Sequence, residues 1–223
     1  ENDLKAFSAG WAIKPHDEVF EEDDFQRRFK AAVVNWFSEH EAAMMEEIVA
    51  GAVALARRLG TSEFIREPQH ILVDEYQDLN RLEQEFVNLL AAESELLLVV
   101  GDPNQSIYGF KFAYPTGITD FSHEANVRSW NSLVTGRCPG RVVEVANQLI
   151  VQADPGTTEL LESLRPMEGE VRFVQSENQI TEFQRTVSSI AERLRAGVTP
   201  ENIIVLVPKK KLGADFAEYF DAS

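Results

Sequence analysis

Two short apolar segments that end in acidic residues place the strongest constraint on the fold of this chain. One is His70-Ile-Leu-Val-Asp74, and the other runs from Leu96 to Val100 and continues into Gly101-Asp102. Their length and continuous apolar character are typical of buried parallel strands. Between them, Asn80 followed by Glu83 predicts a capped helix start. Strand, helix and strand in this order predict a parallel pair with a right-handed crossover, so we expect an α/β fold.

The acids that follow the two predicted strands are the first candidates for a functional site. In parallel sheets, ligands gather at the carboxyl ends of the strands, where we place Asp74, Glu75 and Asp102. Adjacent acids at such a point can divide the work of nucleotide hydrolysis, because one holds magnesium while its neighbour polarises the attacking water. A bare Asp-Glu pair is more typical of a solvated strand end, so the pair needs support from a second motif.

The rest of the chain predicts further helices and strands around this unit. Residues 1–20 show no clear period and are expected to be irregular. Acids at 21–24 precede apolar residues at helical spacing, which predicts a helix, and a second helix is expected from about Glu41 to Leu59, with Gly60 as its stop. Towards the C-terminus we expect a strand over 129–134, a helix over 141–151, a linker over 152–170, a strand over 171–174, a helix over 180–194, a strand over 203–207 and a helix over 214–219.

Composition and charge exclude several classes of protein. Hydrophobic residues make up 44% and charged residues 26% of the chain, a globular balance. No apolar run is long enough to span a bilayer, so we expect a cytoplasmic protein, nucleoid-associated if bacterial. Cys138 is the only cysteine and the four histidines lack metal-ligand spacing, so any metal must bind through carboxylates, which suits magnesium. The net charge of −16 argues against a broad basic DNA-binding face but leaves room for a narrow groove that stacks single-strand bases.

A second motif follows the acidic pair further along the chain. It reads Val99-Val-Gly-Asp-Pro-Asn-Gln-Ser-Ile-Tyr-Gly-Phe-Lys-Phe-Ala113, after Asp74-Glu75-Tyr76-Gln77-Asp78. Together the two motifs resemble the Walker B motif and the third motif of superfamily-one DNA helicases of the UvrD/Rep/PcrA type. The resemblance implies a RecA-like parallel sheet lobe flanked by helices, followed by the start of a second RecA-like lobe.

The same resemblance implies roles for the matching residues. Asp74 corresponds to the magnesium ligand, Glu75 to the general base, and Gln105 to the glutamine that senses the γ-phosphate of ATP. The positions implied to bind ATP are Asp74, Gln77, Asp102, Gln105 and Arg137. Tyr108 and Phe110 resemble the aromatic residues that stack on bases, with Lys111 beside them as a positive charge; core packing is the alternative for the two aromatics. Phe110 stands where tryptophan is usual, and Lys111 replaces the more common arginine.

A third match is looser. Leu133-Val-Thr-Gly-Arg-Cys-Pro-Gly140, which leads into a predicted helix, resembles the fourth helicase motif, and Arg137 falls at the arginine that reaches the γ-phosphate from the second lobe. Gly136 replaces the usual aromatic residue, which leaves an exposed arginine without a role as the alternative. Lys209-Lys210-Lys211 could contact DNA phosphates, although an ordinary solvated loop is the better explanation of them.

The phosphate-binding loop of this family is absent from the printed sequence, which has no G-x-x-x-x-G-K-[ST] pattern. We therefore expect a piece of a longer motor, inactive by itself. In it, residues 1–68 would be a mostly helical part of the first lobe or its insertion, 69–128 the RecA-like core, and 129–223 the fourth motif and the start of the truncated second lobe.

Two functional hypotheses follow. In the first, the parent protein is an ATP-dependent helicase of DNA repair or replication that acts on single-stranded DNA and duplex junctions; a helicase–nuclease of the AddA/RecB type is a variant of it. In the second, a helicase-like domain without catalysis serves as a scaffold.

Overall fold

The computed structural model describes residues 2–14, 19–61, 70–107, 109 and 112–222. Within this part the chain forms two compact units, Glu1–Ser132 and Leu133–Ser223. Mixed helices and parallel strand pairs make up the fold, so the predicted α/β class is confirmed. Among the described helices, none combines the length and apolar character that a bilayer crossing requires.

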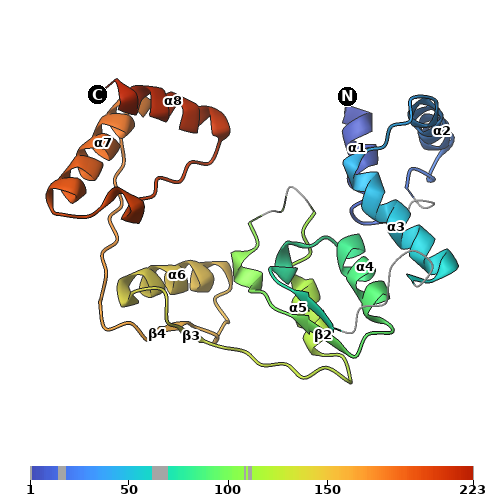
Figure 1. The fold of residues 1–223 in the computed structure, drawn as a ribbon, viewed down its shortest axis with the longest axis horizontal. Helices are drawn as coiled ribbons and strands as arrows, with labels where there is room; N and C mark the ends of the chain where they lie inside the picture. The colour runs from blue at the N-terminus through green and yellow to red at the C-terminus, as the bar shows by residue number, and fades with distance from the viewer. Residues whose placement is uncertain (1, 15–18, 62–69, 108, 110–111, 223) are drawn as a thin grey trace. The chain divides into compact units, whose positions relative to one another are not determined.

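Three helices open the first unit (Figure 1): α1 (Asn2–Gly10), α2 (Asp24–Glu39) and α3 (Met45–Leu59). The predicted irregular lead-in is therefore wrong, because Phe7 and Trp11 on and after α1 are fully buried in an aromatic core with their ring centroids 4.4 Å apart. One large aromatic residue on a short helix and another just after it do not make a recognisable helical period, yet both are buried. The other residues of this core are Val19, Ala50, Val53 and Leu82.

Both predicted helices after the lead-in are confirmed, with one shifted start. Asp23 caps α2, since its side chain accepts a hydrogen bond from Gln26 N, and α3 begins at Met45 rather than near Glu41. Gly60 ends α3 with a positive φ of 80°, as its position in the sequence predicts.

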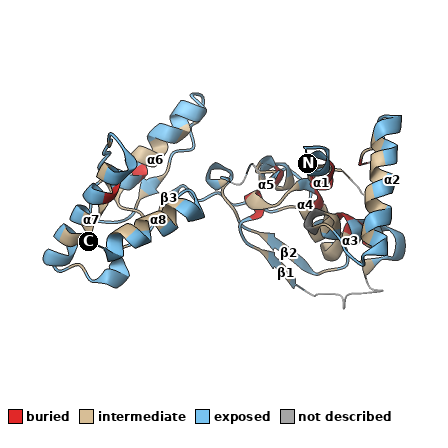
Figure 2. Ribbon diagram, turned by 90° about the horizontal axis from the view of Figure 1, so that it is seen from above, coloured by how far each residue is buried: buried red, intermediate tan, exposed pale blue. Residues whose placement is uncertain are grey.

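A parallel strand pair and its crossover helix follow α3. Strand β1 (His70–Val73) pairs in register with β2 (Leu96–Val99), and α4 (Arg81–Ala91) connects them and packs against α3. The predicted strand–helix–strand unit is confirmed, including the Asn80–Glu83 capping box. Full burial of the strands is not confirmed. Exposed and partly buried side chains alternate along both strands, and Leu72 is 70% exposed. The alternation shows that only one face of this two-stranded sheet is covered. Figure 2 shows exposed residues on both β1 and β2.

Short turns lie at the carboxyl ends of these strands. A 3₁₀ turn η3 (Tyr76–Asp78) follows β1, a second one η4 (Pro103–Gln105) follows β2, and the short helix α5 (Thr116–Ser122) packs against both. Two backbone hydrogen bonds continue the ladder past the strands: Val100 N donates to Val73 O over 2.8 Å, and Tyr76 N donates to Val100 O over 3.0 Å. The two turns are thereby held side by side.

The second unit contains a short parallel pair and three helices. Strand β3 (Val134–Thr135) pairs with β4 (Glu162–Ser163), and the helices are α6 (Gly140–Ala153), α7 (Gln179–Arg195) and α8 (Lys210–Asp221). The predicted helices in this half are confirmed, although α8 begins four residues earlier than expected. Helices α7 and α8 pack through Phe183, Phe216 and Tyr219.

The strand predictions in the second half are mostly wrong. The strand expected over 129–134 shrinks to Val134–Thr135, and the expected linker contains β4. Residues 171–174 and 203–207 are not hydrogen-bonded as strands, and Phe173 and Leu206 are 84% and 83% exposed. Apolar character gives a segment the potential to form a strand, but a strand also needs a partner for its backbone groups.

Candidate active site

Asp74 and Glu75 lie at the carboxyl end of β1, at the point where the chain turns into η3. Glu75 has φ 53° and ψ 40°, in the left-handed region that residues other than glycine rarely occupy. Its N–H donates to Asp74 Oδ1 over 2.9 Å. A left-handed backbone at a glutamate costs on the order of 1 kcal/mol, and such conformations cluster at functional sites.

Gln77 connects the ends of the two strands. Its side chain is only 1% exposed. Its Nε2 donates to Glu75 Oε2 over 2.7 Å, and its Oε1 accepts from Asp102 N over 3.1 Å. Because one amide bonds to both motifs, the carboxylate of Glu75 is oriented by the backbone at the end of β2.

Asp102 extends this network to Gln105. One carboxylate oxygen of Asp102 accepts from Asn104 N over 2.9 Å, and the other accepts from Gln105 Nε2 over 2.8 Å. Glu75, Gln77, Asp102 and Gln105 therefore form one hydrogen-bonded chain across the strand ends. With both oxygens of Asp102 engaged, this residue is arranged to orient Gln105.

Gly101 provides the space that this network needs. A Cβ atom at position 101 would lie 2.4 Å from Gln77 Oε1 and 3.2 Å from Tyr76 N. Any larger residue would displace either the amide of Gln77 or the backbone of the η3 turn. The Gly101-Asp102 pair thus combines close backbone approach with a positioned carboxylate.

Two further residues of the η3 turn are partly or wholly enclosed. Tyr76 is buried, and this burial, together with the negative charge of Glu124, raises the pKa of its hydroxyl. In the part of the chain that the structure describes, Asp78 Oδ1 is buried and has no hydrogen-bond partner. A buried carboxylate oxygen without a donor is suited to a water or a cation.

The acidic residues fit a magnesium ion that keeps most of its waters. Asp74 is exposed, and in the described contacts its carboxylate accepts a single hydrogen bond, from Glu75 N, so an oxygen remains for a ligand. Among the described residues, no group of three or more histidine, cysteine or acidic side chains could enclose a metal. Magnesium is typically held by one or two carboxylates together with water and substrate phosphates, so this donor set suits it.

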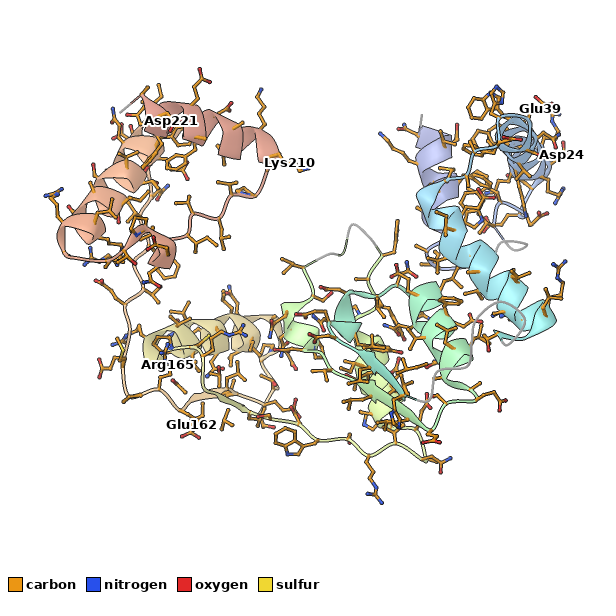
Figure 3. All side chains as sticks on the ribbon, viewed as in Figure 1. Asp24, Glu39, Glu162, Arg165, Lys210 and Asp221 are labelled. Atoms are coloured by element: carbon orange, nitrogen blue, oxygen red, sulfur yellow. The ribbon has the colours of Figure 1, made fainter. Side chains whose placement is uncertain are left out.

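The remaining predicted site residues lie elsewhere. Arg137 belongs to the second unit and is exposed, with its carbonyl accepting from Arg165 Nη1 over 3.0 Å; Figure 3 labels Arg165 beside β4. Tyr108, Phe110 and Lys111 lie outside the described residues. Lys209 to Lys211 are exposed at the start of α8, where Figure 3 labels Lys210.

Sequence reasoning missed one buried polar residue close to this site. Gln84 on α4 is enclosed by backbone carbonyls of the η3 turn and of the segment before α5. A glutamine beside the apolar positions of a helix gives no signal of burial.

Comparison with known proteins shows similarity to DNA helicases. Residues 20–126 match the model of the UvrD/REP helicase N-terminal domain. The chain is 26% identical over 199 residues to the ATP-dependent DNA helicase PcrA of Staphylococcus epidermidis, covering 86% of this chain and 27% of the relative.

Two other similar proteins are also named as DNA helicases and are also matched over a small part of their length. The ATP-dependent DNA helicase UvrD2 of Mycobacterium bovis is 30% identical over 174 residues, which cover 75% of this chain and 23% of the relative. The probable DNA helicase II homolog of Mycoplasma genitalium is 38% identical over 87 residues, which cover 38% of this chain and 12% of the relative. The chain therefore spans about a quarter or less of the length of these relatives.

Proposed function

Since this chain is UvrD/Rep/PcrA-like, we propose that it forms part of the motor of an ATP-dependent DNA helicase, in which ATP hydrolysis drives translocation on single-stranded DNA and separation of the duplex. The observation that carries this proposal is the hydrogen-bonded chain from Glu75 through Gln77 and Asp102 to Gln105. It joins a candidate base for hydrolysis to a candidate phosphate sensor, and a scaffold would have no use for that arrangement.

The hydrolytic roles that we propose use the contacts of this site. The carboxylate of Glu75 is held by Gln77 and accepts a proton from the attacking water. Asp74 holds magnesium, which neutralises charge on the phosphates when bound. The amide of Gln105, oriented by Asp102, donates to the γ-phosphate without adding a charge. Arg137 is proposed to stabilise the negative charge that develops in the transition state.

Coupling to DNA is proposed to pass through the residues after Gln105. Tyr108 and Phe110 stack on bases of single-stranded DNA, with Lys111 as a nearby phosphate contact. Stacking contributes roughly 1–3 kcal/mol per base and tolerates any sequence, which suits a translocating motor. The strongly acidic chain, with a net charge of −16, favours this local mode of binding over a broad basic surface.

The two units are proposed to be parts of two RecA-like lobes. The confirmed β1–α4–β2 unit and the acids at its strand ends support this assignment for the first unit. For the second unit, the β3–α6–β4 parallel arrangement supports it. We add finer proposals of the same kind. They are a role in DNA repair or replication, action at duplex junctions, a cytoplasmic or nucleoid location, and an attached nuclease as in AddA/RecB-type enzymes.

The test is ATP hydrolysis by the whole protein with and without single-stranded DNA. We expect turnover that requires magnesium and rises when single-stranded DNA is added. The 223-residue chain alone should show no measurable turnover, because its sequence contains no phosphate-binding loop. Whole protein that binds partners but neither hydrolyses ATP nor responds to DNA would favour the scaffold instead.

A further inference from the structure

The buried amide of Gln84 contacts two chain segments that are distant in sequence. Gln84 Nε2 lies 2.9 Å from Tyr114 O, 3.2 Å from Leu79 O and 3.5 Å from Tyr76 O. Tyr76 and Leu79 belong to the turn that follows Glu75, whereas Tyr114 precedes α5. One side chain on α4 thus bonds to both segments.

The surroundings permit only one orientation of this amide. Three carbonyl oxygens surround its nitrogen, so a flipped amide would place oxygen against oxygen. A Cβ atom at Gly117 would lie 1.9 Å from Gln84 Oε1 and 2.6 Å from its Nε2. Gly117 is buried, and its N–H donates to the same Tyr114 carbonyl over 3.0 Å. The glycine therefore provides the space that the amide occupies.

Tyr114 is held at three further points. Its N–H donates to Leu79 O over 2.8 Å, and its hydroxyl donates to Asp120 Oδ2 over 2.7 Å. The guanidinium of Arg81, on the first turn of α4, lies 4.0 Å from the centre of the Tyr114 ring. The backbone at Ala113 also pairs with Asn80. The segment around Tyr114 is thus anchored on the residues that directly follow the Glu75 turn.

We propose that Gln84 is a positioning residue that sets the segment following the base-stacking positions relative to the turn that carries the catalytic acid. The inference rests on the proposed function, because it assigns DNA contact to Tyr108 and Phe110 and proton transfer to Glu75. Gln84 bonds to Tyr114, in the segment that follows the proposed DNA-contacting positions, and to the residues that follow Glu75. It thereby holds the two segments together. Gln84 is assigned no direct contact with nucleotide or DNA, because its amide is buried against backbone carbonyls.

The energetics favour positioning over mere stabilisation. Each of the three carbonyls also accepts a backbone hydrogen bond: Tyr76 O from Leu79 N, Leu79 O from Tyr114 N, and Tyr114 O from Gly117 N. Loss of the Gln84 amide therefore leaves none of them without a donor, so we expect only a small decrease in melting temperature. Within the described residues, Gln84 is the side chain whose hydrogen bonds reach both segments. Its loss leaves the backbone hydrogen bond from Tyr114 N to Leu79 O and the Asn80–Ala113 bridge between them, but removes this side-chain link.

The first experiment replaces Gln84 by methionine in the whole protein. Methionine has the same length and no donor, so it fills the space without the hydrogen bonds. We expect the concentration of single-stranded DNA that half-saturates ATP turnover to rise by about tenfold, the factor that one net hydrogen bond of about 1.4 kcal/mol provides. Turnover at saturating DNA should fall much less than the half-saturating concentration rises.

Gly117→Ala provides a second, independent variant. Its Cβ atom must displace the Gln84 amide, so it should raise the half-saturating DNA concentration in the same direction. Combined with Gln84→Ala, which removes the amide, Gly117→Ala should add little further, and the two effects should be clearly non-additive. Gly51→Ala on α3 is the matched control, because its Cβ atom would meet no atom within 4 Å.

The outcomes separate this inference from the proposed function. If Gln84→Met and Gly117→Ala lower the melting temperature but leave the half-saturating DNA concentration unchanged, Gln84 is only a packing residue and the inference is wrong. Additive effects in the double variant would also contradict it. Absence of DNA-stimulated turnover in the unaltered protein would instead reject the proposed function, and this inference with it.

Discussion

Gln77 Nε2 donates a hydrogen bond to Glu75 Oε2 over 2.7 Å, and the same amide accepts from the backbone of Asp102. The position of the candidate base therefore depends on the geometry at the end of the neighbouring strand. A side chain that bonds to both strand ends makes the acid pair and the second motif into one site.

Replacement of Glu75 by glutamine in the whole protein should abolish most ATP turnover and leave ATP binding largely intact. The glutamine oxygen can still accept from Gln77, so the geometry persists while the proton acceptor is lost. We expect the turnover number to fall by about a hundredfold to ten-thousandfold. Steady-state hydrolysis and binding of a fluorescent nucleotide measure the two properties.

A glutamate outside the site provides the control for this change. Glu93→Gln, at an exposed position after α4, should hydrolyse ATP at the normal rate. Near-normal unwinding by Glu75→Gln would mean that Glu75 is not the base.

Substitution of Gln77 by leucine should reduce turnover by about tenfold to a hundredfold, by analogy with the loss of residues that orient metal ligands. The loss of orientation should act on the turnover number more than on the Michaelis constant for ATP. Gly101→Ala should have a similar effect, because its Cβ atom would lie 2.4 Å from Gln77 Oε1. Activity of either variant equal to that of the unaltered protein would show that Glu75 needs no such support.

The stability of the first unit should decrease at alkaline pH because of Tyr76. Burial raises the pKa of Tyr76 above its usual value of 10.0, and the charge of Glu124 raises it further. The unfolded chain thus releases this proton at lower pH than the folded chain does. The contribution to stability is complete below pH 10 and is lost as the pH rises through the higher folded pKa.

Denaturant unfolding between pH 8 and pH 11 measures this dependence. Tyr76→Phe should flatten the alkaline decline in stability, whereas Tyr219→Phe, in the second unit, should leave it unchanged. An identical pH dependence in Tyr76→Phe and the unaltered chain would assign the decline to other groups.

Removal of the cap of α4 should destabilise the first unit. Asn80 Oδ1 accepts from Glu83 N over 2.9 Å, and Asn80 N donates to Glu83 Oε2 over 2.8 Å. Asn80→Ala should cost about 1 kcal/mol, visible as a lower melting temperature. Asn178→Ala, which removes the cap of α7, is the matched change in the other unit. Hydrogen exchange should accelerate in α4 for the first variant and in α7 for the second; the same pattern in both variants would contradict the prediction.

Elements defined by local patterns could be predicted from the sequence. Asn80 and Glu83 predict the start of α4 because a capping box is formed entirely within one turn, and Gly60 predicts the end of α3 for a similar reason. The strands ending at Val73 and Val99 could be predicted because each is a short, continuous apolar run that is followed by an acidic residue. Few structures other than a strand fit such a run. Residues 171–174 and 203–207 carry the same apolar signal, but the signal says nothing about the partner that a strand requires.

The sequence by itself determined the mixed α/β class, the βα order of the first unit and the presence of Asp74, Glu75, Asp102 and Gln105 after its strands. Only the tertiary structure decided that Gln77 bonds to both strand ends and that Gln84 holds Tyr114 against the η3 turn. The physical reason is range. Caps, turns and apolar periods depend on residues within a few positions of one another. Hydrogen bonds of these two glutamines, in contrast, join groups 25 and 30 positions apart, and their partners are defined only once the strands have paired and α4 has packed.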